Sequence, residues 1–141
     1  MPLIDHFGIL APLYDRVFKQ VDVEMWKNLL NLSGKGLLLD IGGGTGRVSS
    51  GLSQYVRKII VLDESIEMLA EAVKKPGLSG LMARAEKLPI EGNTVNFIIM
   101  IDAFHHLRDQ LTTLEEVVRV LKPGGKIIIE EPDIDLFGVK L

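Results

Sequence analysis

Glycines at alternate positions are the first residues of this sequence whose types and spacing could do chemistry. Residues 38–47 read Leu-Leu-Asp-Ile-Gly-Gly-Gly-Thr-Gly-Arg, so Gly42, Gly44 and Gly46 follow an apolar run and precede a helical pattern. Glycine reaches positive φ angles and lets a ligand approach the backbone closely. A helix that begins here would add free N–H groups and the positive end of its dipole. The segment therefore predicts a ligand-binding loop.

Three ligand classes compete for this loop. A phosphate-binding P-loop needs Gly-Lys-Ser/Thr, and the sequence Gly46-Arg47-Val48 does not supply it. A dinucleotide fingerprint needs a third glycine where Arg47 stands, because helix and strand pack closely there. The alternating glycines are typical of loops that hold S-adenosylmethionine. A plain tight turn between strand and helix is the alternative without a ligand.

A carboxylate on the next apolar run narrows this choice. Asp63 follows the run Lys58 to Leu62 and lies about twenty residues beyond the first glycine, where doubly wound sheets place a carboxylate that accepts hydrogen bonds from a ribose diol. Asp63 could also cap the helix that begins near Ser65, and the two roles can coexist. Together with the glycines, Asp63 favours a ligand that contains ribose.

Four sequence blocks then carry a family resemblance, in the family's order and spacing: Leu39–Gly46, Val61–Met68, Ala85–Pro89 and Val120–Lys126. With them the chain resembles class I S-adenosylmethionine-dependent methyltransferases, in the type 11-like branch that includes the quinone-biosynthesis C-methyltransferases and many small-molecule enzymes. The resemblance covers nearly the whole chain. It implies a single domain over residues 1–141, with a helical cap region at 1–35. It also implies methyl transfer to a small molecule by in-line displacement, with S-adenosyl-L-homocysteine as the product.

The resemblance also implies contacts with the cofactor, residue by residue. The loop Gly42 to Gly46 would wrap its methionine and ribose, Asp40 would orient its amino group through water, and Asp63 would take the ribose hydroxyls. Arg84 stands where the family commonly has an Asp that accepts from the adenine amine, and Arg cannot accept a hydrogen bond. The expected adenine contacts therefore move to the backbone of Ala85 and the carboxylate of Glu86. The full expected set is Asp40, Gly42, Gly43, Gly44, Thr45, Gly46, Asp63, Glu64, Ser65, Met68, Ala85, Glu86, Ile101 and Asp102.

Candidate catalytic groups follow the fourth apolar run and stand near the N-terminus. If the acceptor is an oxygen or an acidic carbon, a base is useful, and His106 is the first candidate, followed by His105, Asp102 and Tyr14. Tyr14 matches a Tyr-Asp pair in the family's N-terminal helix. Both histidines could instead be polar residues at a strand–helix junction, and Tyr14 could pack on a helix surface. No metal is expected, because no other ligand stands at a suitable spacing.

The elements that must position these residues alternate between strand and helix. Apolar runs predict strands at 36–41, 58–62, 78–83, 94–101 and 126–130, and helical spacing predicts helices within 5–32, 45–55, 65–75 and 111–121. Apolar residues that run on without alternation suit strands covered on both faces. The expected fold is α/β, Rossmann-like and doubly wound: a mainly parallel sheet in three α/β/α layers, with the family's strand order 3-2-1-4-5.

Apolar residues on two of these helices predict which faces are buried. The helix after Ser65 would bury Ile66, Leu69 and Val73. The helix before the last strand would bury Leu111, Leu114, Val117, Val118 and Leu121.

Composition excludes several other classes of protein. The chain has 141 residues, of which 47% are apolar and 25% charged, as expected for one globular domain. Its net charge of −3 disfavours a nucleic-acid partner. It has no cysteine, hence no disulfide, and it shows no signal peptide and no apolar run that could span a membrane. We therefore expect a cytoplasmic protein.

The end of the chain leads to one further expectation. Family members usually continue with more helices and a hairpin that completes the sheet, whereas this sequence ends at Leu141, so the family's final strands would be missing. Strand 126–130 would then be an apolar edge, and such edges pair with another segment. We expect a homodimer, or coverage of this edge by the tail Pro132–Leu141. A binding module without catalysis, or one that needs a partner chain, is the second functional reading, and a nicotinamide-dependent oxidoreductase is the third.

Overall fold

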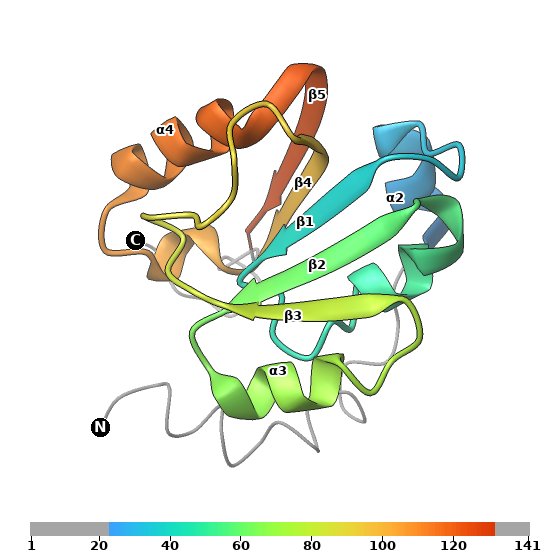
Figure 1. Ribbon diagram of the computed structural model, residues 1–141, viewed down its shortest axis with the longest axis horizontal. Coiled ribbons are helices and arrows are strands. Elements are labelled where there is room, and N and C mark those ends of the chain that lie inside the picture. Colours follow the sequence, from blue (N-terminus) through green and yellow to red (C-terminus); the bar gives the residue numbers. More distant parts are fainter. Residues whose placement is uncertain (1–22, 132–141) are drawn as a thin grey trace, which may run out of the picture.

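A single parallel sheet organises the computed structural model, which describes residues 23–131 (Figure 1). Its strands are β1 (Leu37–Ile41), β2 (Lys58–Asp63), β3 (Leu78–Met82), β4 (Val95–Ile101) and β5 (Leu121–Glu130). They lie in the order β3-β2-β1-β4-β5, and each neighbouring pair is parallel. This confirms the expected fold class and strand order.

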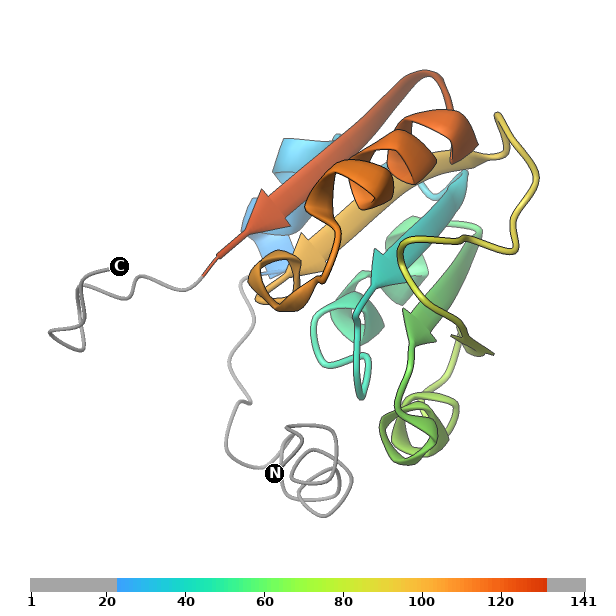
Figure 2. The same cartoon turned by 90° about the vertical axis from the view of Figure 1, so that its left-hand side faces the viewer.

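Helices cover both faces of the sheet because the strands are apolar on both sides. Successive side chains of a strand point to opposite faces. Leu38 and Ile99 accordingly join the core beneath α2 (Val23–Leu30), the 3₁₀ helix η1 (Ser49–Tyr55) and α3 (Ile66–Ala72). Leu39 and Ile98 join the opposite core, beneath α4 (Gln110–Val120). Figure 2 shows α2 and α4 on opposite sides of β4 and β5.

The buried faces of α3 and α4 differ from the predicted ones. Helix α3 buries Met68, Leu69 and Ala72, whereas Ile66 and Val73 are exposed. Only Leu69 of the predicted stripe is therefore correct. The burial of Met68 and Ala72 beside it completes a face with helical spacing that counting the larger aliphatic residues missed.

On α4 the buried residues are Thr113, Val117 and Val120, spaced i, i+4 and i+7. Leu111 and Val118 are 68% and 73% exposed, so their predicted burial is wrong, and Leu114 is also exposed. Two apolar stripes compete on this helix, and the buried one contains a threonine. Thr113 can be buried because its hydroxyl donates a hydrogen bond to the Asp109 carbonyl.

The segment after the glycines is not the helix predicted for residues 45–55. Turns follow β1, and a 3₁₀ helix begins only at Ser49. The segment 49–53 reads Ser-Ser-Gly-Leu-Ser, which has low helix propensity. A Cβ at Gly51 would lie 2.7 Å from the Val23 side chain, so this glycine allows α2 to pack closely. The expected contribution of an α-helix dipole to the loop is therefore absent.

Strand β5 begins directly after α4, five residues earlier than predicted. Val95 pairs with Leu121 and Phe97 pairs with Lys126, so the predicted turn Lys122–Gly125 is an irregularity within the strand. Strands β3 and β5 are the two edges of the sheet. Among residues 23–131, no helix is long and apolar enough to cross a bilayer.

Candidate active site

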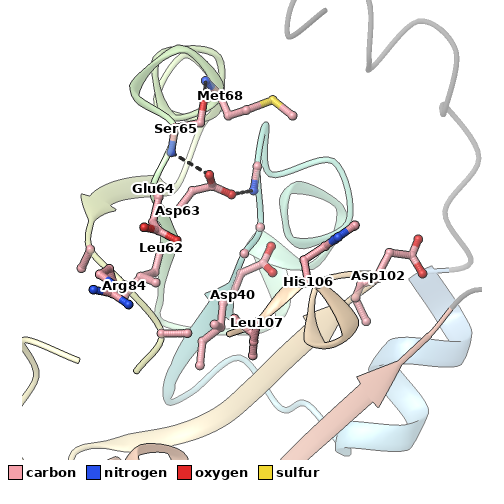
Figure 3. A pocket seen from close by; sticks show the side chains of 18 of the residues that line it. Asp40, Leu62, Asp63, Glu64, Ser65, Met68, Arg84, Asp102, His106 and Leu107 are labelled. Atoms are coloured by element: carbon pink, nitrogen blue, oxygen red, sulfur yellow. Dashed lines mark hydrogen bonds between the residues drawn. The ribbon is translucent and has the colours of Figure 1, made fainter. Parts of the chain in front are cut away.

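The glycine turn and Asp63 meet because β1 and β2 end side by side. Ile41 pairs with Leu62, and the Gly42 N–H donates to the Leu62 carbonyl at 2.7 Å. One Asp63 carboxylate oxygen, Oδ2, accepts from the Gly44 N–H, and the other, Oδ1, accepts from the Ser65 N–H, both at 2.9 Å (Figure 3). Asp63 therefore faces the glycine turn and also stabilises the start of α3.

Two opposing effects act on the pKa of Asp63 in the free protein. Burial raises the pKa of Asp63, and hydrogen bonds from the Ser65, Gly44 and Glu64 N–H groups oppose that rise. Each carboxylate oxygen can accept more than one hydrogen bond. Asp63 thus keeps acceptor capacity for hydroxyl groups of a ligand.

Asp40 lies at the base of the turn and is almost fully buried, with 2% exposure. Burial raises the pKa of Asp40 to about 7; the Ser49 hydroxyl and Arg47 oppose this shift, whereas Asp63 adds to it. A Cβ on Gly43 would lie 2.4 Å from the Asp40 carboxyl carbon, so this position has room only for glycine. Within the described part of the chain, Asp40 Oδ2 has no hydrogen-bond partner. A buried oxygen of this kind requires a donor from a ligand or water.

A cavity of about 450 Å³ opens at the carboxyl ends of β1, β2 and β4. This is where open parallel sheets bind ligands, next to the point at which the strand order reverses, between β1 and β4. The predicted site residues that line it are Asp40, Gly42, Gly43, Gly44, Asp63, Glu64, Ser65, Met68, Ala85, Glu86, Ile101, Asp102 and His106.

Four predicted residues are placed elsewhere. Thr45, Gly46 and His105 do not contribute to the cavity lining, and Tyr14 lies outside the described residues. Thr45 is buried, and its carbonyl accepts from the Lys75 ammonium, so its place beside the turn is structural.

Several lining residues were not among the predicted contacts. These are Ile41, Arg47, Val48, Leu62, Ala83, Arg84, Ala103, Leu107 and Arg108. Most are chain neighbours of predicted residues, so widening each motif by one or two positions would have found them. Arg108 stands two positions after His106, and its place on the cavity depends on the course of η2 (Phe104–His106).

The loop after β3 forms a second wall of the cavity. The Ala83 N–H donates to the Asp63 carbonyl at 3.2 Å, and this hydrogen bond joins the second wall to the end of β2 at Asp63. Glu86 is largely buried, and its Oε1 has no hydrogen-bond partner among residues 23–131. Arg84 Nη2 lies 3.9 Å from Glu86 Oε2, and the Arg84 side chain is 57% exposed. Glu86 therefore offers a second unmet carboxylate oxygen.

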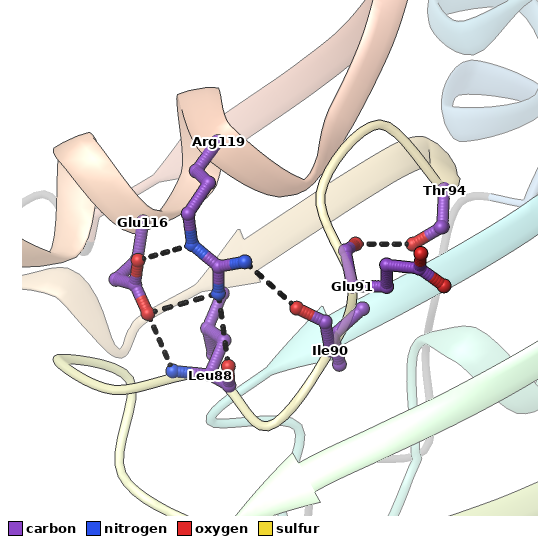
Figure 4. Close-up of polar contacts among 6 residues, drawn as sticks. All are labelled: Leu88, Ile90, Glu91, Thr94, Glu116 and Arg119. Atoms are coloured by element: carbon purple, nitrogen blue, oxygen red, sulfur yellow. Dashed lines mark hydrogen bonds and ion pairs between the residues drawn. The ribbon is translucent and has the colours of Figure 1, made fainter.

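A clamp from α4 fixes the continuation of this loop (Figure 4). The Arg119 guanidinium donates to the carbonyls of Leu88 and Ile90, each at 2.9 Å. Glu116 accepts from the Leu88 N–H at 2.8 Å and from Arg119 Nε at 2.6 Å. The loop that carries Glu86 is thus anchored two residues later.

The opposite end of the cavity holds His106 and a strained aspartate. Asp102 follows β4 with φ of +56°, a left-handed conformation that is uncommon for a non-glycine residue, and its N–H donates to the Glu130 carbonyl at 2.7 Å. His106 lines the cavity nearby (Figure 3). Burial lowers the pKa of His106, as does His105, whereas Glu131 and Asp102 oppose this. Among the described residues, no group of three or more His, Cys, Asp or Glu is arranged to hold a metal.

Comparison with known proteins identifies a family. The family model described as "Methyltransferase domain" matches residues 39–129. The ubiquinone/menaquinone biosynthesis C-methyltransferase of Wigglesworthia glossinidia brevipalpis is 32% identical, over 80% of this chain and 51% of its own length. The demethylmenaquinone methyltransferase of Oceanobacillus iheyensis is 34% identical, over 79% of this chain and 51% of its own length. The chain thus spans about half the length of these relatives.

Solved structures agree with this result. The crystal structure of a SAM-dependent methyltransferase from Aquifex aeolicus superimposes with a TM-score of 0.69 at 31% identity, covering 79% of this chain and 67% of that one. S-Adenosylmethionine carries hydrogen-bond donors that fit three carboxylates of the cavity. Its ammonium group suits Asp40, its ribose diol suits Asp63, and its purine amino group suits Glu86. Sequence blocks, sheet order, site chemistry and relatives agree: the chain belongs to the class I S-adenosylmethionine-dependent methyltransferases.

Proposed function

We propose that this protein transfers the methyl group of S-adenosylmethionine to a small-molecule acceptor by in-line displacement. One observation carries the proposal: a single cavity brings together Asp40, Asp63 and Glu86, with acceptor oxygens spaced along its walls. A sulfonium cofactor with an ammonium end, a ribose diol and an amino-purine has donors for all three. Family membership supports the same reaction class.

We assign the parts of the cofactor along this cavity. Asp40 would hold the ammonium group and Asp63 the ribose hydroxyls. The purine would lie between Met68, whose thioether provides a polarizable surface, and the loop that contains Ala85 and Glu86. At the end of β4, a carbonyl of Ile101 or Asp102 would add a second acceptor for the ammonium.

The chain's residues contribute mainly alignment to this reaction. Bound S-adenosylmethionine supplies a methyl group already activated as a sulfonium. Orientation of two reactants in one site accounts for a large part of such an acceleration. Asp40 and Asp63 would hold the methyl donor in place. His106 and Asp102 border the end of the cavity where an acceptor would approach.

Two measurements test the proposal. Calorimetry should show binding of S-adenosylhomocysteine and none of NADH, because Arg47 occupies the position of the dinucleotide fingerprint's third glycine. Transfer of a labelled methyl group should then be measured to a panel of phenols, amines and hydroquinones. The panel should include reduced 1,4-naphthoquinone, because the names of two relatives refer to quinone methylation. If NADH binds and S-adenosylhomocysteine does not, the assignment is wrong.

A binding module that needs a partner is the second candidate function. The observation that favours it is that the chain spans about half the length of its curated relatives. Such a module would bind S-adenosylhomocysteine with the same dependence on Asp63 yet transfer no methyl group to any member of the panel. The transfer assay therefore separates the two candidates.

We also propose that a second copy covers the edge formed by β5. Within residues 23–131 the strand pairs only with β4, and Ile129 on it is 38% exposed. Leu111 and Val118 of α4 add exposed apolar surface. Light scattering should give a dimer mass that falls when Ile129 is replaced by lysine; a monomer mass for the unmodified protein would contradict the proposal. The cytoplasm is the compartment we propose, because a chain without disulfides is compatible with a reducing environment.

A further inference from the structure

Three titratable residues form a row from the cavity to the surface at the end of β4 and β5. The two strands are parallel and Ile101 pairs with Glu130, so the next residue, Glu131, arrives beside the turn of η2. There the Glu131 carboxylate contacts His105 Nδ1. An ionised carboxylate only accepts, so Nδ1 of His105 is the donor in this contact. The pairing of β4 with β5 therefore fixes the orientation of the His105 ring.

The oriented His105 ring packs against the ring of the next residue, His106. The ring centroids of His105 and His106 lie 3.9 Å apart with their planes inclined by 43°. His106 lines the cavity, whereas His105 and Glu131 do not. The row is therefore ordered as cavity, His106, His105 and Glu131.

We propose that His106 takes a proton from the methyl acceptor, and that Glu131 is a positioning residue that acts on His106 through His105. The inference deepens the proposed function and rests on it for the reaction that the histidine serves. It also names an acceptor class: a nucleophile that carries a dissociable proton, such as a phenol or a hydroquinone.

The reaction balances with no further reagent. The bond between the acceptor atom and its hydrogen breaks, and the proton moves to a ring nitrogen of His106. The electron pair left on the acceptor forms the new bond to the methyl carbon. The bond from that carbon to sulfur breaks, and its electrons remain on sulfur as a neutral thioether. The positive charge of the sulfonium thus ends on the imidazolium of His106, which later releases its proton to water.

The surroundings of His106 suit this role. Burial lowers its pKa, and the adjacent His105 lowers it further, while Glu131 and Asp102 act in the opposite direction. Asp40, Arg47 and Arg108 are further charged groups that line the cavity. A lowered pKa favours the neutral imidazole, which has one unprotonated ring nitrogen, as a base must.

His105 and Glu131 should shift the His106 pKa in opposite directions, and residues with a purely structural role would not produce this pattern. The chain has three histidines, so the ring protons of His105 and His106 can be followed by NMR in the cofactor-free protein, with His6→Gln to remove the third signal. His105→Asn removes a neighbour that lowers the His106 pKa, so the His106 titration should move to higher pH by about half a unit. Glu131→Gln removes a negative neighbour and should move it to lower pH. Glu130→Gln, one residue earlier on β5, is the matched control and should leave it unchanged.

The same variants extend to catalysis. His106→Gln should lower kcat by about a hundredfold or more and remove the ascending limb of the pH profile of kcat/KM for a phenolic acceptor. Glu131→Gln should shift that limb and lower kcat less, with binding of S-adenosylhomocysteine unchanged. Equal shifts in both variants, or none, would overturn the inference while leaving the proposed function intact. Failure of the unmodified protein to bind S-adenosylhomocysteine would count against the proposed function instead, because the histidine titrations need no cofactor.

Discussion

At the scale of a single residue, Asp40, the proposed partner of the cofactor's ammonium group, should make cofactor binding depend on pH. Burial raises its pKa to about 7, above the value in the unfolded chain. Asp40 therefore stabilises the free protein at low pH, and this contribution is lost as pH rises from about 4 through about 7. A cationic group at the unpartnered Oδ2 favours the ionised form, so affinity for S-adenosylhomocysteine should increase about tenfold between pH 6 and pH 8.

Calorimetry across this pH range measures the effect, and proton release measured in two buffers reports the ionisation. Asp40→Asn should bind more weakly and lose the pH dependence, while Glu115→Gln on the exposed face of α4 serves as the control. Binding of unchanged pH dependence in Asp40→Asn would show that another group titrates.

Glu86 should determine which purine the protein prefers in a bound ligand. Its unpartnered Oε1 accepts a hydrogen bond and cannot donate one when ionised. The natural protein should therefore bind S-adenosylhomocysteine at least tenfold more tightly than S-inosylhomocysteine, in which an oxo group replaces the amino group. Glu86→Gln supplies an amide donor and should reduce or reverse this ratio. Equal ratios in both proteins would place the purine elsewhere.

Residue types and spacing predicted much of this site, because the strongest signals are local. Gly44 and Asp63 follow apolar runs that predicted strands, and the hydrogen bond between them shows that they lie together, as expected. Glu131 was missed because its contact with His105 depends on pairing between β4 and β5, which joins residues 26 positions apart. Arg108 was missed for a related reason, since its place depends on the course of η2.

At the scale of an element, substitutions on α4 test which of the helix's two apolar stripes stabilises the fold. Val117 is 2% exposed, and the adjacent Val118 is 73% exposed. Val117→Ala should lower the free energy of unfolding by about 2 kcal/mol, because it removes buried methyl groups and leaves a cavity. Val118→Ala should change it by less than about 0.5 kcal/mol. Chemical denaturation of the two variants measures the difference, and equal losses would mean that both stripes are covered.

The clamp between α4 and the loop at Leu88 should stabilise the wall that contains Glu86. Its hydrogen bond with Arg119 lowers the pKa of Glu116, so the contribution of Glu116 is present above its unfolded pKa and is lost as pH falls through the folded value. Arg119→Ala should lower Tm by a few degrees at pH 7 and weaken cofactor binding modestly. The loss in Tm should shrink at pH 3. A double variant with Glu116→Gln should show non-additivity, and full additivity would contradict a shared clamp.

Strands were predicted more accurately than helix faces, for a physical reason. A strand that is buried on both sides is a continuous apolar run, so its existence does not depend on knowing which side faces the core. A helix must choose a face, and α4 buries Thr113 with the help of a local hydrogen bond while Leu111 stays exposed. The helix after the glycines failed for lack of propensity in its serine-rich sequence.

Across the whole molecule, the parallel order of the strands creates the site. Residues from three strand ends, at positions 40–44, 62–65 and 101–103, meet in one cavity although they are far apart in the sequence. The resemblance predicted this order, and the structure confirms it. Assignment of the single domain to residues 1–141 stays a prediction, as does the role of Tyr14, because the structure describes residues 23–131.

Calorimetric titration with S-adenosylhomocysteine tests the central claim most directly, using the unmodified protein, Asp63→Asn and the exposed control Glu115→Gln. We propose that the Asp63 carboxylate, which accepts from the Gly44 N–H, recognises the ribose, so Asp63→Asn should weaken binding by about tenfold to a hundredfold while its Tm confirms that it is folded. The control should bind as tightly as the unmodified protein. No heat of binding at millimolar ligand, or equal affinity in all three proteins, would contradict the account.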